Sequence, residues 1–186
     1  GIYRINTPAV LPGGAFSFNQ YLIADEAPLL FHTGPRGMFP LVAEAIGKVL
    51  PLESLRYIGF AHVEADEMGS LNQFLAAAPR AVAVASQTAT PPHVPHGWEN
   101  GFMMETATRT LLCGDLFTQG GSGATPITET DILGPSEAFR APMDYYAHTP
   151  NTAAVLERLA GEQPQVRACM HGSAWRGDGA ALLRTL

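Results

Sequence analysis

Four side chains that can bind a metal ion occur within six residues of the sequence. His62, Glu64 and Asp66 are spaced by two residues, so an extended chain would place all three on the same side. Glu67 breaks this alternation and can join the others only if the chain turns there. The apolar run before them, residues 57–60, is typical of a short buried strand.

The residues after this cluster indicate a helix. Gly69 provides the flexibility for a turn, and Ser70 with Gln73 three residues later has the pattern of a helix capping box. We therefore expect the cluster in a loop between a strand and a helix, at the carboxyl end of the strand, where open α/β sheets usually place their sites. Taken alone, such an acidic loop is more often a solvated turn, so the rest of the chain has to decide.

The composition is that of a globular protein. A chain of 186 residues suits one domain with a hydrophobic core, and we expect a single domain over residues 1–186. The hydrophobic content of 46% and the charged content of 15% exclude a disordered chain. The net charge of -6, with no Lys/Arg cluster, argues against a nucleic-acid partner. No apolar run reaches the roughly 18 to 20 residues of a membrane span, so we expect no membrane partner.

The cysteine content fits a reducing compartment. Cys113 and Cys169 are too few for a disulfide framework, although one disulfide between them is compatible with the sequence. No signal peptide is visible at the start of the chain, and a cytoplasmic location is expected. The two thiols are interpreted as small buried apolar groups, with redox activity as the alternative.

The rest of the chain alternates strand-like and helix-like segments. A hairpin is predicted from residues 16–24 and 28–32, with Asn19 and Gln20 at the surface or in a turn. Buried strands are predicted at residues 57–60 and 81–85, a second hairpin from residues 101–107 and 109–112, and a last strand at residues 165–170. Helices are predicted at residues 38–50, 71–78, 135–161 (interrupted near 149–150) and from 179 onward. This order predicts a layered α/β fold.

Three later residues repeat the placement of the first cluster. Asp115 and His171 directly follow apolar strands, and His96 lies in a loop rich in Thr and Pro. A lone His or Asp at a strand end is usually a cap or turn residue. Together with a His-x-Glu-x-Asp loop, however, these residues form a set of metal-ligand types.

The candidate ligands form one series along the chain: His62-x-Glu64-x-Asp66, His96, Gly114-Asp115 and His171-Gly172. This series resembles the metallo-β-lactamase superfamily, and within it the di-iron branch, which includes the core of flavodiiron proteins and stand-alone oxygen-binding di-iron proteins. Zinc hydrolases of the superfamily carry His-x-His-x-Asp-His, whereas the di-iron branch carries His-x-Glu-x-Asp-His, so Glu64 favours the di-iron branch. The resemblance implies an α/β fold built as a four-layer αββα sandwich.

Two metal ions are implied by this resemblance. The implied ligands are His62, Glu64 and His96 for the first metal and Asp66 and His171 for the second, with Asp115 as the bridge. Carboxylate and imidazole ligands suit iron or manganese and require no thiolate. We expect two iron ions, with zinc or manganese as alternatives.

Two features depart from the family. Its fourth motif position is a His, whereas this chain has Glu67, which is either a ligand of a more anionic second site or turns away and leaves that site weakened or empty. The stretch before His96 is short, so either the protein is trimmed or a loop near Thr90–Pro91 is missing. His93 is a rival for His96, but the family's ligand is followed closely by a Trp, and Trp98 is present.

The implied function is the binding or reduction of a small diatomic ligand, oxygen or nitric oxide. There is no flavodoxin domain in 186 residues, so a reductase would need a separate electron donor; otherwise the protein is a sensor. Tyr145 and Tyr146 resemble a Tyr-Tyr-Ala stretch of the branch, and Tyr146 is the candidate catalytic residue; core aromatics on a helix are the alternative. A homodimer is expected, as is common in this branch.

Two other functions remain open. In a metal-dependent hydrolase, the metal pair would lower the pKa of a bridging water and act on a small-molecule ester, thioester or phosphoester, with Asp66 as a general base if it does not bind metal. A degenerate relative with one metal or none would have a binding role. Glu64 favours the di-iron protein over both, while Glu67 weakens it.

Overall fold

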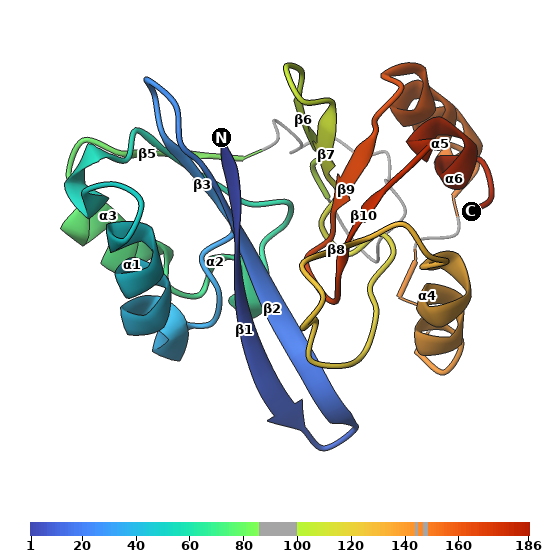
Figure 1. The fold of residues 1–186 in the computed structure, drawn as a ribbon, viewed down its shortest axis with the longest axis horizontal. Coiled ribbons are helices and arrows are strands. Elements are labelled where there is room, and N and C mark those ends of the chain that lie inside the picture. Colours follow the sequence, from blue (N-terminus) through green and yellow to red (C-terminus); the bar gives the residue numbers. More distant parts are fainter. Residues whose placement is uncertain (86–99, 144, 147–148) are drawn as a thin grey trace. The chain divides into compact units, whose positions relative to one another are not determined.

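The chain is built from two units, each with its own mixed β-sheet and helices. The computed structural model describes residues 1–85, 100–143, 145–146 and 149–186 (Figure 1). The first unit comprises residues 1–7 and 18–86, and the second comprises residues 8–17 and 87–186. The single domain predicted over residues 1–186 stays a prediction.

The first sheet has the strand order β1-β2-β3-β4-β5. Its strands are β1 (Ile2–Leu11), β2 (Gly14–Ile23), β3 (Leu29–Phe31), β4 (Tyr57–Gly59) and β5 (Val82–Val84). Its helices are η1 (Arg36–Met38), α1 (Phe39–Gly47), η2 (Leu52–Ser54), α2 (Ala65–Met68) and α3 (Leu71–Ala77). β2 and β3 form the predicted antiparallel hairpin, and β3, β4 and β5 run parallel. The carboxyl ends of β3 and β4 therefore lie at the same edge of the sheet.

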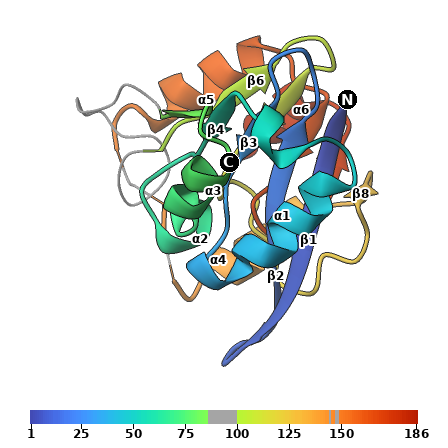
Figure 2. The same ribbon diagram turned by 90° about the vertical axis from the view of Figure 1, so that its left-hand side faces the viewer.

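Helices α1 and α3 lie side by side on one face of this sheet (Figures 1 and 2). The rings of Phe39 and Phe74 meet edge to face at 4.9 Å, and Ile46 packs with Leu30 and Ile58 of the sheet in one buried cluster. Burial of each such side chain contributes about 1.5–3 kcal/mol. This core fixes the end of β4, which leads into residues 62–67 with their candidate metal ligands.

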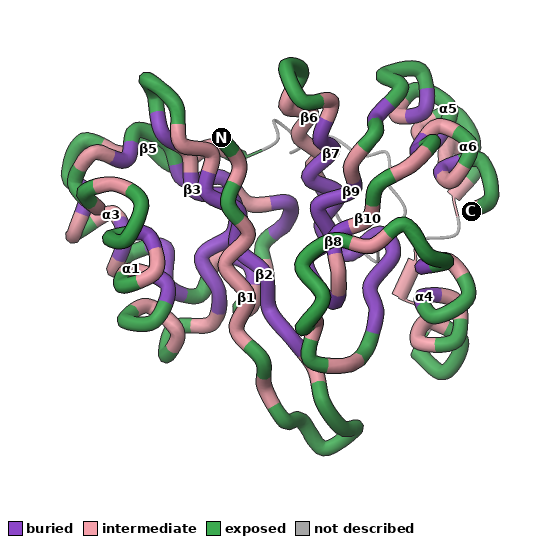
Figure 3. Tube along the Cα trace, in the orientation of Figure 1, coloured by how far each residue is buried: buried purple, intermediate pink, exposed green. Residues whose placement is uncertain are grey.

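The second sheet has the strand order β6-β7-β9-β10-β8. Its strands are β6 (Met103–Glu105), β7 (Thr110–Leu112), β8 (Ile127–Thr128), β9 (Val166–Ala168) and β10 (Ala174–Arg176), and its helices are α4 (Leu133–Arg140), α5 (Thr152–Gly161) and α6 (Gly179–Leu183). β7 and β9 are parallel neighbours, with Leu112 beside Ala168. Asp115 and His171 follow these two strands, and they leave the sheet at the same edge. Figure 3 shows the buried residues along β7 and β9.

The tip of the β1–β2 hairpin belongs to the second unit. The carbonyl of Ala15 accepts a hydrogen bond from the N–H of Gly121 at 2.9 Å. The ring of Phe16 stacks on that of Phe139 at 5.6 Å. Through these contacts the first residues of β2 become part of the surroundings of His171.

The structure corrects several predictions of local structure. β5 is not buried, since Val82 is 59% exposed. Asn19 and Gln20 are fully buried within β2 rather than at the surface. The predicted helix over residues 135–161 is two helices, α4 and α5, and β1, β8 and β10 were not predicted. Among the described residues, no helix has the length and apolarity to cross a membrane.

Candidate metal centre

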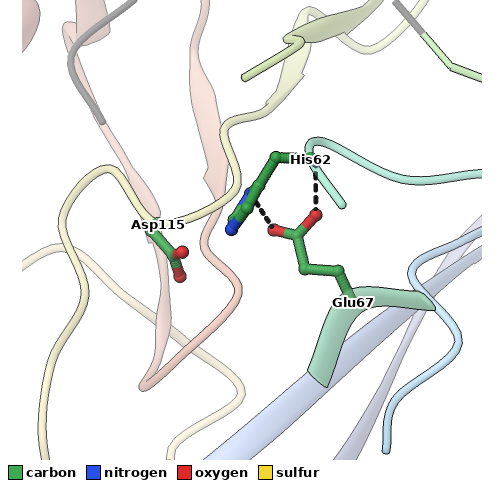
Figure 4. A group of neighbouring side chains, drawn as sticks. All are labelled: His62, Glu67 and Asp115. Carbon is green, nitrogen blue, oxygen red and sulfur yellow. Dashed lines mark hydrogen bonds and ion pairs between the residues drawn. The ribbon is translucent and has the colours of Figure 1, made fainter. Parts of the chain in front are cut away.

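The loop after β4 is closed by the side chain of Glu67. One oxygen of this carboxylate, Oε2, accepts hydrogen bonds from the backbone N–H groups of Ala61 at 2.9 Å and His62 at 2.8 Å (Figure 4). The chain bends at residues 61–63, is extended at Glu64 and turns into α2 at Ala65. The predicted extended segment is therefore wrong: Glu64 still meets His62, but Asp66 lies in the first turn of α2.

The His62 ring lies between two carboxylates. Its Nε2 is 2.7 Å from Oε2 of Glu64, and its Nδ1 is 3.1 Å from Oε1 of Glu67. The side chains of His62 and Glu67 are buried, whereas that of Glu64 is 40% exposed. The Nε2 edge is hydrogen-bonded to the carboxylate of the partly exposed Glu64, which only accepts, and the Nδ1 edge faces Glu67.

A second histidine, His32, lies on the other side of Glu67. Its Nε2 is 3.4 Å from Oε1 of Glu67, and both side chains are buried. His32 follows β3 and adopts a left-handed backbone conformation with φ 65°. Sequence reasoning placed it inside a strand and missed it as a site residue. The available signal was the one used for Asp115 and His171, a polar residue at the carboxyl end of an apolar strand.

The hydroxyl of Ser70 forms hydrogen bonds to the loop after β3 instead of capping α3. Its hydroxyl donates to the carbonyls of Thr33 at 2.7 Å and Gly34 at 3.2 Å, and the N-terminus of α3 has no side-chain cap. The N–H of Thr33 in turn donates to the carbonyl of Glu67 at 2.6 Å. The predicted capping box is therefore wrong: the buried Ser70 hydroxyl satisfies carbonyls of the His32 loop.

The second unit brings Asp115 and His171 together. Oδ1 of Asp115 is 3.2 Å from Nε2 of His171, and both side chains are largely buried. Nδ1 of His171 is 2.7 Å from the carbonyl of Ser17. Since a carbonyl only accepts, Nδ1 carries the proton and the Nε2 lone pair faces Asp115. The ring of Phe16 packs against the imidazole at 4.3 Å.

Tyr145 and Tyr146 support the loop that carries Asp115. The hydroxyl of Tyr145 donates to the Asp115 carbonyl, and the N–H of Phe117 donates to the hydroxyl of Tyr146, both at 3.4 Å. The two residues lie between α4 and α5, so the expectation of helical aromatics is wrong. Burial raises the pKa of Tyr145 to about 12 and also raises the pKa of Tyr146. Both hydroxyls are therefore protonated at neutral pH.

The donor set of each unit fits a metal ion. In both, a buried imidazole presents Nε2 beside a carboxylate oxygen. Nδ1 of His171 is hydrogen-bonded to the Ser17 carbonyl, which is the support that metal-binding histidines usually have, and Nδ1 of His62 faces Glu67 at 3.1 Å. Ligand atoms bound at about 2.1 Å to one ion lie roughly 3 Å apart, and the two Nε2-to-carboxylate distances are 2.7 and 3.2 Å. His96, its rival His93 and Trp98 lie outside the described residues.

Comparisons with known proteins agree with this fold. A family model described as "ODP family beta lactamase" matches residues 16–111, which is just over half of the chain. No curated protein matches the chain.

Three solved structures illustrate the similarity. Rubredoxin oxygen:oxidoreductase from Desulfovibrio gigas has a TM-score of 0.76 and 16% identity, over 99% of this chain and 58% of that one. The metal-soaked Flv1 flavodiiron core from Synechocystis has a TM-score of 0.77 and 18% identity, over 99% of this chain and 57% of that one. The apo chemotaxis sensor ODP from T. denticola has a TM-score of 0.70 and 16% identity, over 100% of this chain and 93% of that one.

The chain thus spans somewhat more than half the length of the first two proteins. The matches confirm the predicted fold class, a metallo-β-lactamase-type α/β fold with two sheets and flanking helices.

Proposed function

Because the chain belongs to the ODP family of β-lactamases, on the di-iron branch of the metallo-β-lactamase superfamily, we propose that it is a di-iron protein that binds or reduces oxygen or nitric oxide. The observation that carries this proposal is the repeated arrangement around His62 and His171. Each is a buried imidazole with Nε2 beside a carboxylate oxygen and Nδ1 facing a second oxygen, of Glu67 or of the Ser17 carbonyl. The ligand types, imidazole and carboxylate without thiolate, are those that suit iron.

The proposed ligands are those that the resemblance to the di-iron branch implies. The first metal would be held by His62, Glu64 and His96, the second by Asp66 and His171, with Asp115 shared between them. A pair of iron ions supplies the ability to bind a diatomic molecule and to exchange electrons with it.

Of the roles that the sequence leaves open for Glu67, we propose that of a support rather than a ligand. Both of its oxygens face groups of its own unit: Oε2 accepts two backbone N–H groups, and Oε1 faces His62 and His32. Turning toward a metal would leave two buried N–H groups without this acceptor, which costs about 1–3 kcal/mol each. Glu67 instead keeps its position between the two backbone N–H groups and the imidazoles of His62 and His32.

The proposed partners are a small diatomic ligand and an electron donor. Reduction of the ligand would require electrons, and we propose that a separate donor supplies them. Binding alone would suit a sensor, and one of the similar structures is a chemotaxis sensor. A homodimer in the cytoplasm is the assembly and location we propose, and light scattering of the purified chain tests the dimer.

The decisive experiment is elemental analysis of anaerobically purified protein, together with its optical spectrum before and after air. About two irons per chain and a near-ultraviolet band that appears with oxygen would support the proposal. About two zinc ions and no spectral response would indicate a hydrolase instead. One metal or none would indicate a degenerate relative.

A variant of the shared ligand tests the assignment of residues. Asp115→Ala is expected to lose one or both metals, because the bridging carboxylate serves both. The matched control is Asp25→Ala, which removes an exposed carboxylate from the β2–β3 turn and should retain the full metal content. Unchanged metal content in Asp115→Ala would rule out the bridging role.

A further inference from the structure

Two buried thiols lie next to each other in the second unit. Cys113 and Cys169 follow β7 and β9, whose pairing places Leu112 beside Ala168, so the two cysteines are the next pair along the strands. Neither forms a disulfide, and both are fully buried. Their sulfur atoms are 3.9 Å apart. They are the only cysteines in the sequence.

The backbone geometry at this pair allows a disulfide. The N–H of Cys113 donates to the carbonyl of Ala168, and the N–H of Met170 donates to the carbonyl of Gly114, so the ladder between the strands continues past both cysteines. Neighbouring strands are about 4.8 Å apart, which lies within the roughly 4.4–6.8 Å between Cα atoms that disulfides span. Closing the sulfur–sulfur distance to about 2.05 Å therefore requires side-chain rotation rather than strand movement.

A buried cation lies on the same face of the sheet. Arg167 precedes Cys169 by two residues, and its guanidinium interacts electrostatically with both thiols and with Asp178. Its Nε and Nη2 groups have no hydrogen-bond acceptor in the described part of the chain. A guanidinium in this position stabilises the negative charge that develops on a sulfur atom when it attacks an oxidant.

We propose that Cys113 and Cys169 are a reversible dithiol–disulfide couple that is oxidised by hydrogen peroxide. One sulfur attacks a peroxide oxygen, the O–O bond breaks, and a sulfenic acid and one water form. The second sulfur then displaces the sulfenic oxygen, which leaves as a second water. The thiols lose two electrons and peroxide gains them, and an added dithiol reductant reverses the reaction by thiol–disulfide exchange.

The couple is independent of the proposed metal function, because all its residues belong to the second unit and none is a proposed ligand. The position of the cysteine pair in the sequence nevertheless connects it to the proposed metal site. Asp115 and His171 each follow one of the cysteines by two residues, so the disulfide would tie together the two strand ends that carry them.

The test uses the full chain, freed of metal with a chelator and treated with a small molar excess of hydrogen peroxide. The protein is then unfolded and exposed to an alkylating agent, and the mass of the chain is measured by mass spectrometry. We expect a chain about two mass units lighter that takes up no alkyl group, and return of both alkylation sites after a dithiol reductant.

The single variants Cys113→Ser and Cys169→Ser serve as matched controls. Each lacks the second thiol, so peroxide should leave a monomeric sulfenic acid or an unreacted thiol and no mass loss of two units. Wild-type protein that keeps both alkylation sites after peroxide would overturn the proposal, as would disulfides that form only between chains or only after unfolding. Because the measurement is made without metal, its failure leaves the di-iron proposal standing.

Discussion

Glu67 shows how one buried side chain can decide the shape of a site. Its carboxylate is 1% exposed and lies between two backbone N–H groups and two imidazoles. Glu64, only three residues earlier, is 40% exposed and meets His62 from the other side. The two acids of one short loop therefore have different roles, one holding the loop and the other available to a ligand.

These roles predict different effects on stability. Glu67→Ala removes the acceptor of two buried N–H groups, and each loss costs about 1–3 kcal/mol, so we expect the free energy of unfolding to fall by about 3 kcal/mol. Glu64→Ala removes a partly exposed pairing worth about 0–1 kcal/mol. Urea unfolding of the metal-free variants measures both values. Equal losses in the two variants would refute the supporting role of Glu67.

The two adjacent tyrosines predict a loss of stability at alkaline pH. Burial raises the pKa of Tyr145 from 10.0 to about 12 and that of Tyr146 also upward. The unfolded chain therefore releases these protons first, so their contribution to stability is complete below pH 10 and is lost as the pH rises toward 12. Urea unfolding across this range measures the loss, which should be smaller in the variant with Tyr145→Phe and Tyr146→Phe. An identical alkaline profile in that variant would contradict the prediction.

The chemistry of single residues was partly readable from the sequence. His62, Asp115 and His171 could be singled out because each stands at the end of an apolar run, which places polar groups at a sheet edge. The role of Glu67 could not be predicted, since it depends on two N–H groups of a loop that closes only in the folded chain. His32 carried the same strand-end signal but was assigned to the strand itself.

Longer and more apolar elements were predicted more reliably than short ones. The hairpin of β2 and β3 and the helices α1 and α3 follow from local pattern because a buried face requires apolar residues at fixed spacing. β8 has two residues and β10 has three, too few to show any period. β1 alternates poorly because most of its residues are partly or fully exposed. Such strands are defined by their neighbours in the sheet.

Helix α6 provides a test of packing against helix propensity. Its first residue, Gly179, is buried directly over the guanidinium of Arg167, and a Cβ there would overlap that group. The overlap costs about 1–3 kcal/mol because the Arg167 side chain is itself fully buried. Gly179→Ala should therefore lower the free energy of unfolding, although alanine is the better helix former by about 1 kcal/mol.

Gly161, the last residue of α5, is the matched control for this change. A Cβ at that position would meet nothing within 4 Å, so Gly161→Ala should raise the free energy of unfolding by about 0.5–1 kcal/mol. Thermal unfolding of the two variants compares them directly. A gain of stability in Gly179→Ala would show that Arg167 moves aside freely, and would remove the packing argument.

The proposed ligands are spread along the chain, which gives the proposed metals a role in the whole molecule. His62, Glu64 and Asp66 follow β4, while Asp115 follows β7 and His171 follows β9. A metal pair bound by all of these residues would be released when the chain unfolds around any of the three strands. Metal present at a thousand times its dissociation constant adds about 4 kcal/mol to the folded state.

Hydrogen exchange of the chain with and without metal measures this coupling. With metal bound, we expect the amides of β4 and of β9 to exchange with one common free energy, because opening at either strand releases the proposed metals. Without metal, the two strands should exchange with separate and lower free energies. In Asp115→Ala the metal should no longer have this effect, since the shared ligand is gone. Metal-dependent protection confined to β4 alone would mean that Asp115 and His171 do not bind the ions, and that the proposed ligand set is wrong.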